Sequence, residues 1–183
     1  MGRVYVFLAD GFEEIEALTA VDVLRRAGVT VVTVSVMDTP EVVGAHDVIV
    51  TADAMFSDYD CTDADWLVLP GGMPGASNLA ACEPLCELLK VQASQGRGVA
   101  AICASPSIVL GPLGLLQGKR AVCYPGMEAG MEGATLVREH AVTDGNIITG
   151  QGPASAASFA LAIVAALVGE ETAAEVAQGM LLA

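Results

Sequence analysis

Cys103 lies in a sequence context that is typical of a nucleophilic cysteine. It follows a short apolar run at residues 99–102, and small residues come directly after it, with Pro106 three positions further on. This pattern predicts a buried strand that turns sharply into a helix, as in a nucleophile elbow, with Ser105 as the helix cap. The helix dipole would then lower the pKa of the thiol, giving a reactive and easily oxidised thiolate near neutral pH. The competing interpretation is a buried structural cysteine.

Glu16 is the second candidate because it shares a predicted helix face with small apolar residues, which follow it four, seven and eleven positions later. This face is expected to pack on a sheet. Burial raises the pKa of a carboxyl group, and a protonated acid could donate a hydrogen bond to a neighbouring thiolate. The alternative for Glu16 is a solvated helix charge, which is what we expect for Glu13 and Glu14.

Gly71 and Gly72 follow an apolar run at residues 66–69 and could bring backbone amides close to the sulfur. Gly72 and the amide of Ala104 would form a pair of oxyanion donors. Two glycines after a strand also form ordinary turns, so this signal is weak when taken alone.

The elements that must position these residues alternate between strands and helices. An apolar run at residues 3–8 leads into a helix start, with Asp10 as the cap and Glu13 reaching back to it, and Gly28 ends the helix. Alternation of this kind predicts a mostly parallel sheet with helices on both faces and a site at the carboxyl ends of its strands. The further expected segments are strands at 29–36, 66–69 and 98–101, a helix near 84–95, and three loops that converge at 9–12, 70–74 and 102–106.

Two other segments have the pattern of hairpins. Residues 42–50 and 137–149 contain short apolar runs separated by turn residues, and we expect both to be side elements. The longest apolar run, at 154–168, is rich in alanine and too short for a membrane span, so it is expected to form a buried helix.

Composition excludes several functional classes. The 183 residues are 54% apolar, which is consistent with a single domain covering residues 1–183. A net charge of −14 disfavours nucleic acid and anionic membranes as partners. An odd set of five cysteines without an export signal indicates reduced thiols, mostly in the core, and a cytoplasmic location. Neither His46 nor His140 occurs in a metal-ligand pattern, so no metal is predicted.

Four segments carry a resemblance to a known family: ADGFEEIE at 9–16, LPGG at 69–72, AAICA at 100–104 and QGP at 151–153. They resemble the Parkinsonism-associated deglycase family of the ThiJ/PfpI superfamily, and the likeness covers nearly the whole chain. The resemblance implies a flavodoxin-like three-layer sandwich, formed by one ThiJ/PfpI-type domain. It also implies a homodimer, with the first helix as the expected contact surface.

The resemblance also assigns roles by position. Cys103 is similar to the family's oxidation-prone nucleophile, and Glu16 to the protonated glutamate that hydrogen-bonds it and acts as general acid and base. Gly72 and Ala104 are similar to the backbone donors on the oxyanion side. The residues expected near the substrate are Gly71, Tyr124, Pro125 and His46.

The implied activity is hydrolytic and needs no metal or organic cofactor. Family members are credited with converting α-oxoaldehydes to hydroxy acids without glutathione and with repairing the early adducts of these aldehydes. Both activities are linked to protection from oxidative and carbonyl stress. The alternative is a non-enzymatic redox sensor or chaperone-like dimer that responds through oxidation of Cys103.

Three positions depart from the family pattern. Tyr124-Pro125 stands where many relatives have a histidine before the proline, and a phenol is a poor general base at neutral pH. Ala104 stands where the peptidase branch has a histidine, which disfavours proteolysis. His46 stands where relatives often carry an arginine near the site entrance. We therefore expect a slower or differently selective enzyme that depends on Glu16.

Overall fold

A computed structural model describes residues 2–182, and its centre is a seven-stranded sheet. The strand order is β10-β11-β7-β6-β1-β2-β5, and every neighbouring pair is parallel except β10 and β11. The strands of this sheet are β1 (Arg3–Leu8), β2 (Thr30–Ser35), β5 (Ala54–Met55), β6 (Trp66–Leu69), β7 (Gly98–Ile102), β10 (Ala141–Asp144) and β11 (Ile147–Gly150).

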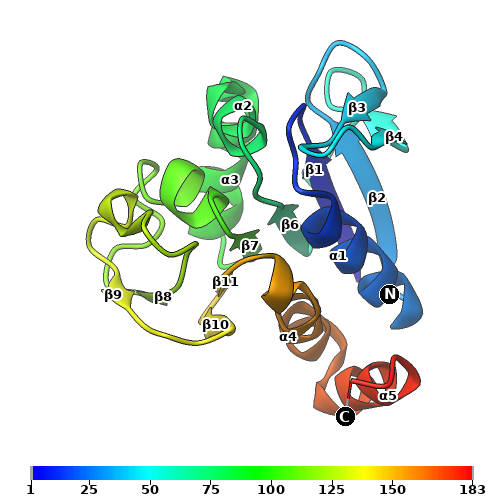
Figure 1. Cartoon of the computed structure of the whole chain (residues 1–183), viewed down its shortest axis with the longest axis vertical. Helices are drawn as coiled ribbons and strands as arrows, with labels where there is room; N and C mark the ends of the chain where they lie inside the picture. Colours follow the sequence, from blue (N-terminus) through cyan, green and yellow to red (C-terminus); the bar gives the residue numbers. More distant parts are fainter. Residues whose placement is uncertain (1, 183) are drawn as a thin grey trace.

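Helices cover both faces of the sheet (Figure 1). One face carries α1 (Glu14–Arg26), α4 (Ala156–Val168) and α5 (Glu170–Gly179), and the other carries α2 (Gly75–Ala81) and α3 (Glu83–Ser94). Alternate residues of β1 belong to the two cores: Val4 and Val6 pack on the α1 side, and Tyr5 and Phe7 on the α3 side. Burial on both faces explains the continuous apolar runs of these strands. The expected mostly parallel, flavodoxin-like α/β sandwich is confirmed.

The two predicted hairpins have different places in the fold. Strands β3 (Glu41–Val43) and β4 (Ile49–Thr51) form a separate antiparallel pair, as expected of a side element. The second hairpin consists of β10 and β11, but β11 pairs with β7 and belongs to the central sheet, so its description as a side element was wrong. All four residues of β11 are buried, which a short apolar run alone does not reveal. A further small pair, β8 (Arg120–Ala121) and β9 (Thr135–Leu136), is parallel.

The start of α1 differs from the expected capping box. Glu13 is the cap, and its Oε2 accepts a hydrogen bond of 2.8 Å from the amide of Glu16. Asp10 instead accepts a hydrogen bond from the amide of Val43, at 2.9 Å, and so joins the loop after β1 to β3. The predicted end of the helix is confirmed, because Gly28 has a φ of 75° and its amide bonds to the carbonyl of Arg25.

The remaining helices follow the sequence with small differences. The expected helix near residues 84–95 is α3, and α2 precedes it. The alanine-rich run forms α4 after a short 3₁₀ turn at Pro153–Ser155. Among residues 2–182, no helix combines the length and apolar character that crossing a membrane requires.

Candidate active site

Three loops meet at the carboxyl ends of β1, β6 and β7, as the sequence predicts. The amide of Glu13, after β1, donates to the carbonyl of Gly71, after β6, at 2.9 Å. The hydroxyl of Ser105, after β7, donates to the carbonyl of Pro70 at 2.5 Å. Backbone and buried hydroxyl contacts of this kind fix the loops against one another and hold the side chains between them in place.

Cys103 stands at the end of β7 in an unusual backbone conformation. Its φ is 65°, in the left-handed region that residues with a side chain rarely adopt, and its amide bonds to the carbonyl of Gly150 at 3.0 Å. Strain of this kind is concentrated at functional sites. The side chain is buried, and the residue is 8% exposed. The sharp strand-to-helix turn is therefore confirmed.

The helix after Cys103 is shorter than the sequence suggests. It is a five-residue π-helix, Pro106–Leu110, with the proline at its start as expected. Ser105 makes no side-chain cap, because its hydroxyl is used by Pro70. One turn of helix supplies only a small dipole, so the predicted dipole effect on the thiol has little support.

Glu16 lies fully buried beside Cys103, which confirms its burial. Its Oε2 accepts a hydrogen bond of 2.7 Å from the amide of Gly71, and its side chain contacts that of Cys103. No donor among the described residues reaches Oε1, as expected for a carboxyl group that holds its proton there. A Cβ at Gly71 would lie 2.6 Å from the Cβ of Cys103 and 2.7 Å from Oε2 of Glu16, so only glycine fits.

Burial determines the protonation of this pair. It raises the pKa of Glu16 to about 7, against the lowering effect of the Gly71 amide. Burial and the charge of an ionised Glu16 raise the pKa of Cys103 to about 12, so the predicted low thiol pKa was wrong. Near neutral pH the pair therefore carries at most one negative charge, and the sulfur bears it only while Glu16 keeps the proton.

Two backbone amides face the sulfur. The amides of Gly72 and Ala104 both interact with the side chain of Cys103, and both lower its pKa. Gly72 has a φ of 90°, and a Cβ there would lie 2.4 Å from the amide nitrogen of Glu13, so this loop also requires glycine. The structure thus brings together the four residues for which the sequence predicts catalytic roles.

Tyr124 and Pro125 border a pocket next to this pair. The amide of Tyr124 donates to the carbonyl of Cys103 at 2.9 Å, and its ring packs beside Gly152 and is partly exposed. The pocket has a volume of about 320 Å³, and its remaining lining comes from residues 151–155. We did not predict this segment as part of the site, although its QGP motif was a sign of it. The side chain of Cys103 does not line the pocket.

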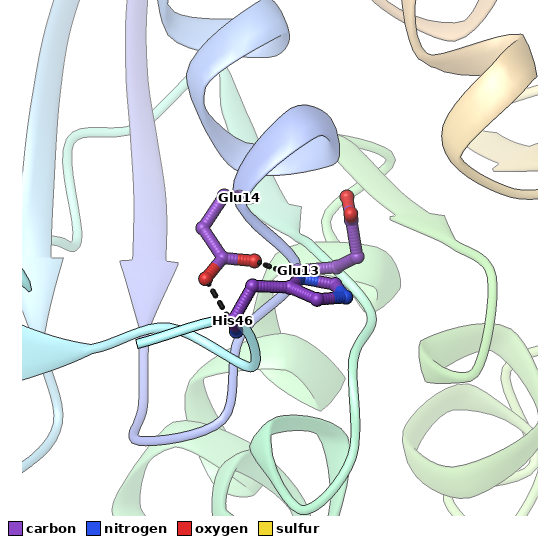
Figure 2. Close-up of side chains that lie close together, drawn as sticks. All are labelled: Glu13, Glu14 and His46. Carbon is purple, nitrogen blue, oxygen red and sulfur yellow. Dashed lines mark hydrogen bonds and ion pairs between the residues drawn. The ribbon is translucent and has the colours of Figure 1, made fainter. Parts of the chain in front are cut away.

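His46, which we expect near the substrate, lies beside the start of α1. It lies in the turn after β3 and contacts Glu14: its amide donates to Oε1 at 2.6 Å, and its ring Nδ1 lies 2.7 Å from Oε2 (Figure 2). Glu13 and Glu14 are each only 7% exposed. The expectation that both are solvated was therefore wrong, because the β3–β4 hairpin covers the start of α1.

The other four cysteines are free thiols. Cys61 and Cys123 are buried, which raises their pKa values to about 12 and about 11, and both pack in the core as expected. Cys82 and Cys86 are half-buried at the start of α3, and Cys82 packs against the core on this face of the sheet, as expected of most of the cysteines.

Comparison with known proteins identifies relatives in sequence and proteins of the same fold. It is 38% identical to protein DJ-1 homolog B of Arabidopsis thaliana over 180 residues, which make up 98% of this chain but 41% of that protein. It is 35% identical over 161 residues to glutathione-independent glyoxalase DJR-1.2 of Caenorhabditis elegans, covering 87% of this chain and 84% of that one.

A solved structure, oxidized DJ-1 of Toxoplasma gondii, superimposes with a TM-score of 0.95 at 39% identity and covers 99% of this chain and 98% of the other. The model of the DJ-1/PfpI family matches residues 2–166, which include every loop of the site described above. The buried cysteine and glutamate at the end of a mostly parallel sheet thus occur in a chain that belongs to the DJ-1/PfpI family.

Proposed function

We propose that this protein is a glutathione-independent glyoxalase or deglycase that acts on α-oxoaldehydes or their early adducts through Cys103. The observation that carries the proposal is the contact between Cys103 and a fully buried Glu16, beside two backbone amides. The similarity to a Caenorhabditis elegans protein named as such a glyoxalase supports the same reaction class.

The first step is addition of the Cys103 sulfur to the aldehyde carbon of the substrate. The pair holds one proton at neutral pH, and its transfer from sulfur to Glu16 generates the thiolate. The carbonyl oxygen becomes an alkoxide, which takes a proton to give a thiohemiacetal. The amides of Gly72 and Ala104 stabilise the negative charge as it develops.

The second step moves hydrogen within the adduct. Glu16, as carboxylate, removes the proton from the former aldehyde carbon and returns a proton to the adjacent carbon. The hydroxyl proton of the thiohemiacetal moves to the ketone oxygen, so that the ketone becomes an alcohol and the thiohemiacetal becomes a thioester. Water then attacks the thioester, releasing the hydroxy acid and returning the thiol. In total, one α-oxoaldehyde and one water give one hydroxy acid, and no external oxidant or reductant is needed.

Tyr124 is expected to border the substrate rather than to move protons. Its ring is partly exposed beside the pocket, and its backbone bonds to Cys103. An ordinary phenol holds its proton at neutral pH, so it can donate a hydrogen bond but cannot act as base. Proton transfer therefore depends on Glu16.

The test measures lactate from methylglyoxal in buffer without glutathione or amines. Wild-type protein is compared with Cys103→Ser and Glu16→Gln, and Asp63→Asn, at the opposite end of the sheet, serves as the control. Lactate formation that disappears in the first two variants and persists in the control supports the proposal. Failure of reduced, folded wild-type protein to form lactate contradicts it.

The second candidate is a redox sensor, favoured by the contacts of the Cys103 side chain with Glu16 and with the amides of Gly72 and Ala104, which could hold an oxidised sulfur. The structural relative from Toxoplasma gondii is described as oxidized. Peroxide would convert Cys103 to a sulfinate, whose oxygens could accept hydrogen bonds from protonated Glu16 and the two amides. A mass gain of two oxygens on Cys103 at low peroxide, together with no aldehyde consumption, would select this function.

We also infer that the protein forms a homodimer through α1. Ile15 and Leu18 are 56% and 40% exposed on this helix, and Ile49 is 64% exposed on β4. Large exposed apolar side chains of this kind can form part of a protein–protein interface. Light scattering should give twice the chain mass for wild-type protein and the chain mass for Ile15→Glu.

A further inference from the structure

The first turn of α1 and the β3–β4 turn bring together three potential metal ligands outside the Cys103 site. Glu13, Glu14 and His46 each offer one ligand atom, and these atoms all lie within 4.8 Å of one another. Figure 2 shows the Glu14 carboxylate directed at the imidazole of His46, with the Glu13 carboxylate on the adjacent side. The two glutamates and the histidine are 32 positions apart, so the spacing of the sequence gives no sign of the group.

The charges of this group are not balanced. Glu13 and Glu14 are each 7% exposed, and in the described residues neither contacts a lysine or arginine. The other carboxylates that form ion pairs in residues 2–182 each have a lysine or arginine partner. Buried carboxylates without a cation are costly, and coordination of a metal is one of the ways in which proteins satisfy them.

Glu13 also has spare bonding capacity. Its Oε2 accepts the hydrogen bond that caps α1, and no donor in the described part of the chain bonds its other oxygen. The residue is 7% exposed, and this second oxygen is not fully buried, so an ion could reach it. In Figure 2 the Glu13 carboxylate lies on the other side of the His46 ring from the Glu14 carboxylate, and the three ligand atoms lie within 4.8 Å of one another.

We propose that Glu13, Glu14 and His46 bind one divalent transition metal ion of the zinc type, with water completing the coordination. One imidazole and two carboxylates form a ligand set that zinc accepts. Bonds of about 2.0–2.2 Å place the ligand atoms of a tetrahedral site about 3–3.5 Å apart. The ligand atoms lie up to 4.8 Å apart, so the most distant ones must approach by up to about 1–2 Å. The His46 side chain is 71% exposed on a turn and can make this movement.

This metal site is separate from the proposed reaction. Its ligands do not include Cys103 or Glu16, and none of the chemical steps above passes through it. The ion would join α1 to the β3–β4 hairpin and so stabilise the packing of this hairpin against the first turn of α1. The proposal can therefore fail while the glyoxalase activity stands, and the reverse also holds.

The experiment is calorimetric titration of reduced, metal-free protein with zinc chloride. Wild-type protein should bind one ion per chain, and both His46→Asn and Glu14→Gln should weaken binding by about tenfold or more. His140→Asn is the matched control and should bind as wild type does. Because His46 is exposed, His46→Asn should keep the wild-type circular dichroism spectrum, whereas Glu13→Gln also removes a charged helix cap.

Cobalt(II) identifies the ligand atoms. An absorption spectrum without a thiolate-to-metal charge-transfer band supports nitrogen and oxygen ligands, and a strong band of this kind places the ion on a cysteine and overturns the proposal. Equal zinc affinity in wild-type and His46→Asn protein overturns it as well. So does an absence of wild-type binding at millimolar zinc.

As a second readout, saturating zinc should raise the melting temperature of wild-type protein, because a ligand that binds only the native state stabilises it. The same zinc concentration should leave His46→Asn unchanged. A rise of the same size in both proteins contradicts the assignment.

Discussion

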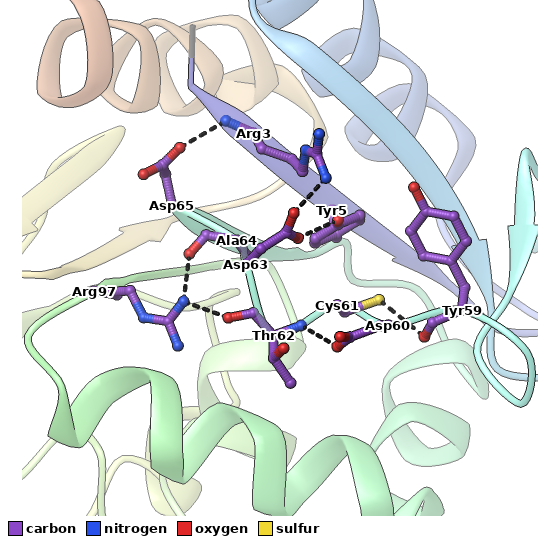
Figure 3. Close-up of polar contacts among 10 residues, drawn as sticks. All are labelled: Arg3, Tyr5, Tyr59, Asp60, Cys61, Thr62, Asp63, Ala64, Asp65 and Arg97. Atoms are coloured by element: carbon purple, nitrogen blue, oxygen red, sulfur yellow. Dashed lines mark hydrogen bonds and ion pairs between the residues drawn. The ribbon is translucent and has the colours of Figure 1, made fainter.

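At the amino ends of β1, β6 and β7, partly exposed acidic side chains pair with arginines, whereas the glutamates at the start of α1, near the carboxyl ends, are buried. Among residues 2–182, no arginine pairs with these glutamates. Figure 3 shows the amino-end network, in which Arg3 pairs with Asp63 and the hydroxyl of Tyr5 donates to Asp63 at 2.6 Å. Arg97 donates to the carbonyls of Thr62 and Ala64 in the same region.

The difference lies in what compensates each charge. At the amino ends, guanidinium groups and water satisfy the carboxylates, and such half-exposed pairs add little to stability. At the carboxyl ends, Glu16 has only a backbone amide and a thiol, and burial raises its pKa to about 7. The charged groups at the amino ends therefore join loops to one another, whereas Glu16 and Cys103 at the carboxyl ends can exchange a proton at neutral pH.

The largest effect is expected from removal of the reactive pair. Cys103→Ser should lower the glyoxalase rate by about a thousandfold or more, since it removes the nucleophile. Glu16→Gln should lower the rate by about a hundredfold or more, because it removes the proton carrier. Steady-state kinetics of lactate formation measure both changes. A variant at the other end of the sheet, Asp63→Asn, should keep the wild-type rate, and a comparable loss there would remove the contrast between the two ends.

Gly71→Ala should damage the site through packing alone. The added methyl group would lie 2.6 Å from the Cβ of Cys103 and must push the pair apart. We expect a loss of activity of about tenfold or more, because small misplacement of reacting groups is costly. Gly179→Ala is the control, since no heavy atom lies within 4 Å of a Cβ built there. Equal rates for Gly71→Ala and wild type would mean that the contact between the pair is not needed.

The pair should also titrate in the neutral range. The pKa of Glu16 is raised to about 7, so the pair is fully protonated well below pH 7 and acquires one negative charge as the pH rises through this value. The rate of Cys103 alkylation by iodoacetamide should therefore rise up to about tenfold per pH unit below 7 and level off above it. Mass spectrometry of the modified peptide measures this rate. In Glu16→Gln the inflection near pH 7 should vanish, and its persistence would assign the titration to another group.

Tyr5→Phe should have the smallest effect, and it should change stability rather than activity. It removes the hydrogen bond to Asp63 and should lower the free energy of unfolding by about 1 kcal/mol, with no change in glyoxalase rate. Urea denaturation measures the stability change. The ring of Tyr5 stays buried in the variant, so a much larger loss would show that the amino-end network contributes more than its exposure suggests.

Much of the fold could be predicted because local patterns determine it. The apolar runs predict the buried strands β1 and β6, and the glycine after α1 predicts the end of that helix. The structure has these elements at the predicted positions. For Glu16, the spacing of small residues on its helix face left burial and a solvated position both open, and the resemblance to the family decided for burial. The position of β11 in the central sheet could not be predicted, because a short, partly apolar segment has the same sequence pattern at the edge and in the middle of a sheet.

By itself, the sequence determined which chemical groups are present and which strand ends carry them: a cysteine after β7, a glutamate on the inner face of α1 and glycines after β6. Only the tertiary structure decided their ionisation, because desolvation and the charge of Glu16, rather than the short helix after Cys103, raise the pKa of the thiol. It also decided the environment of Glu13 and Glu14, since the β3–β4 hairpin buries them and brings His46 into contact. Both outcomes depend on which segments exclude water from a charge, and that depends on packing between parts of the chain far apart in sequence.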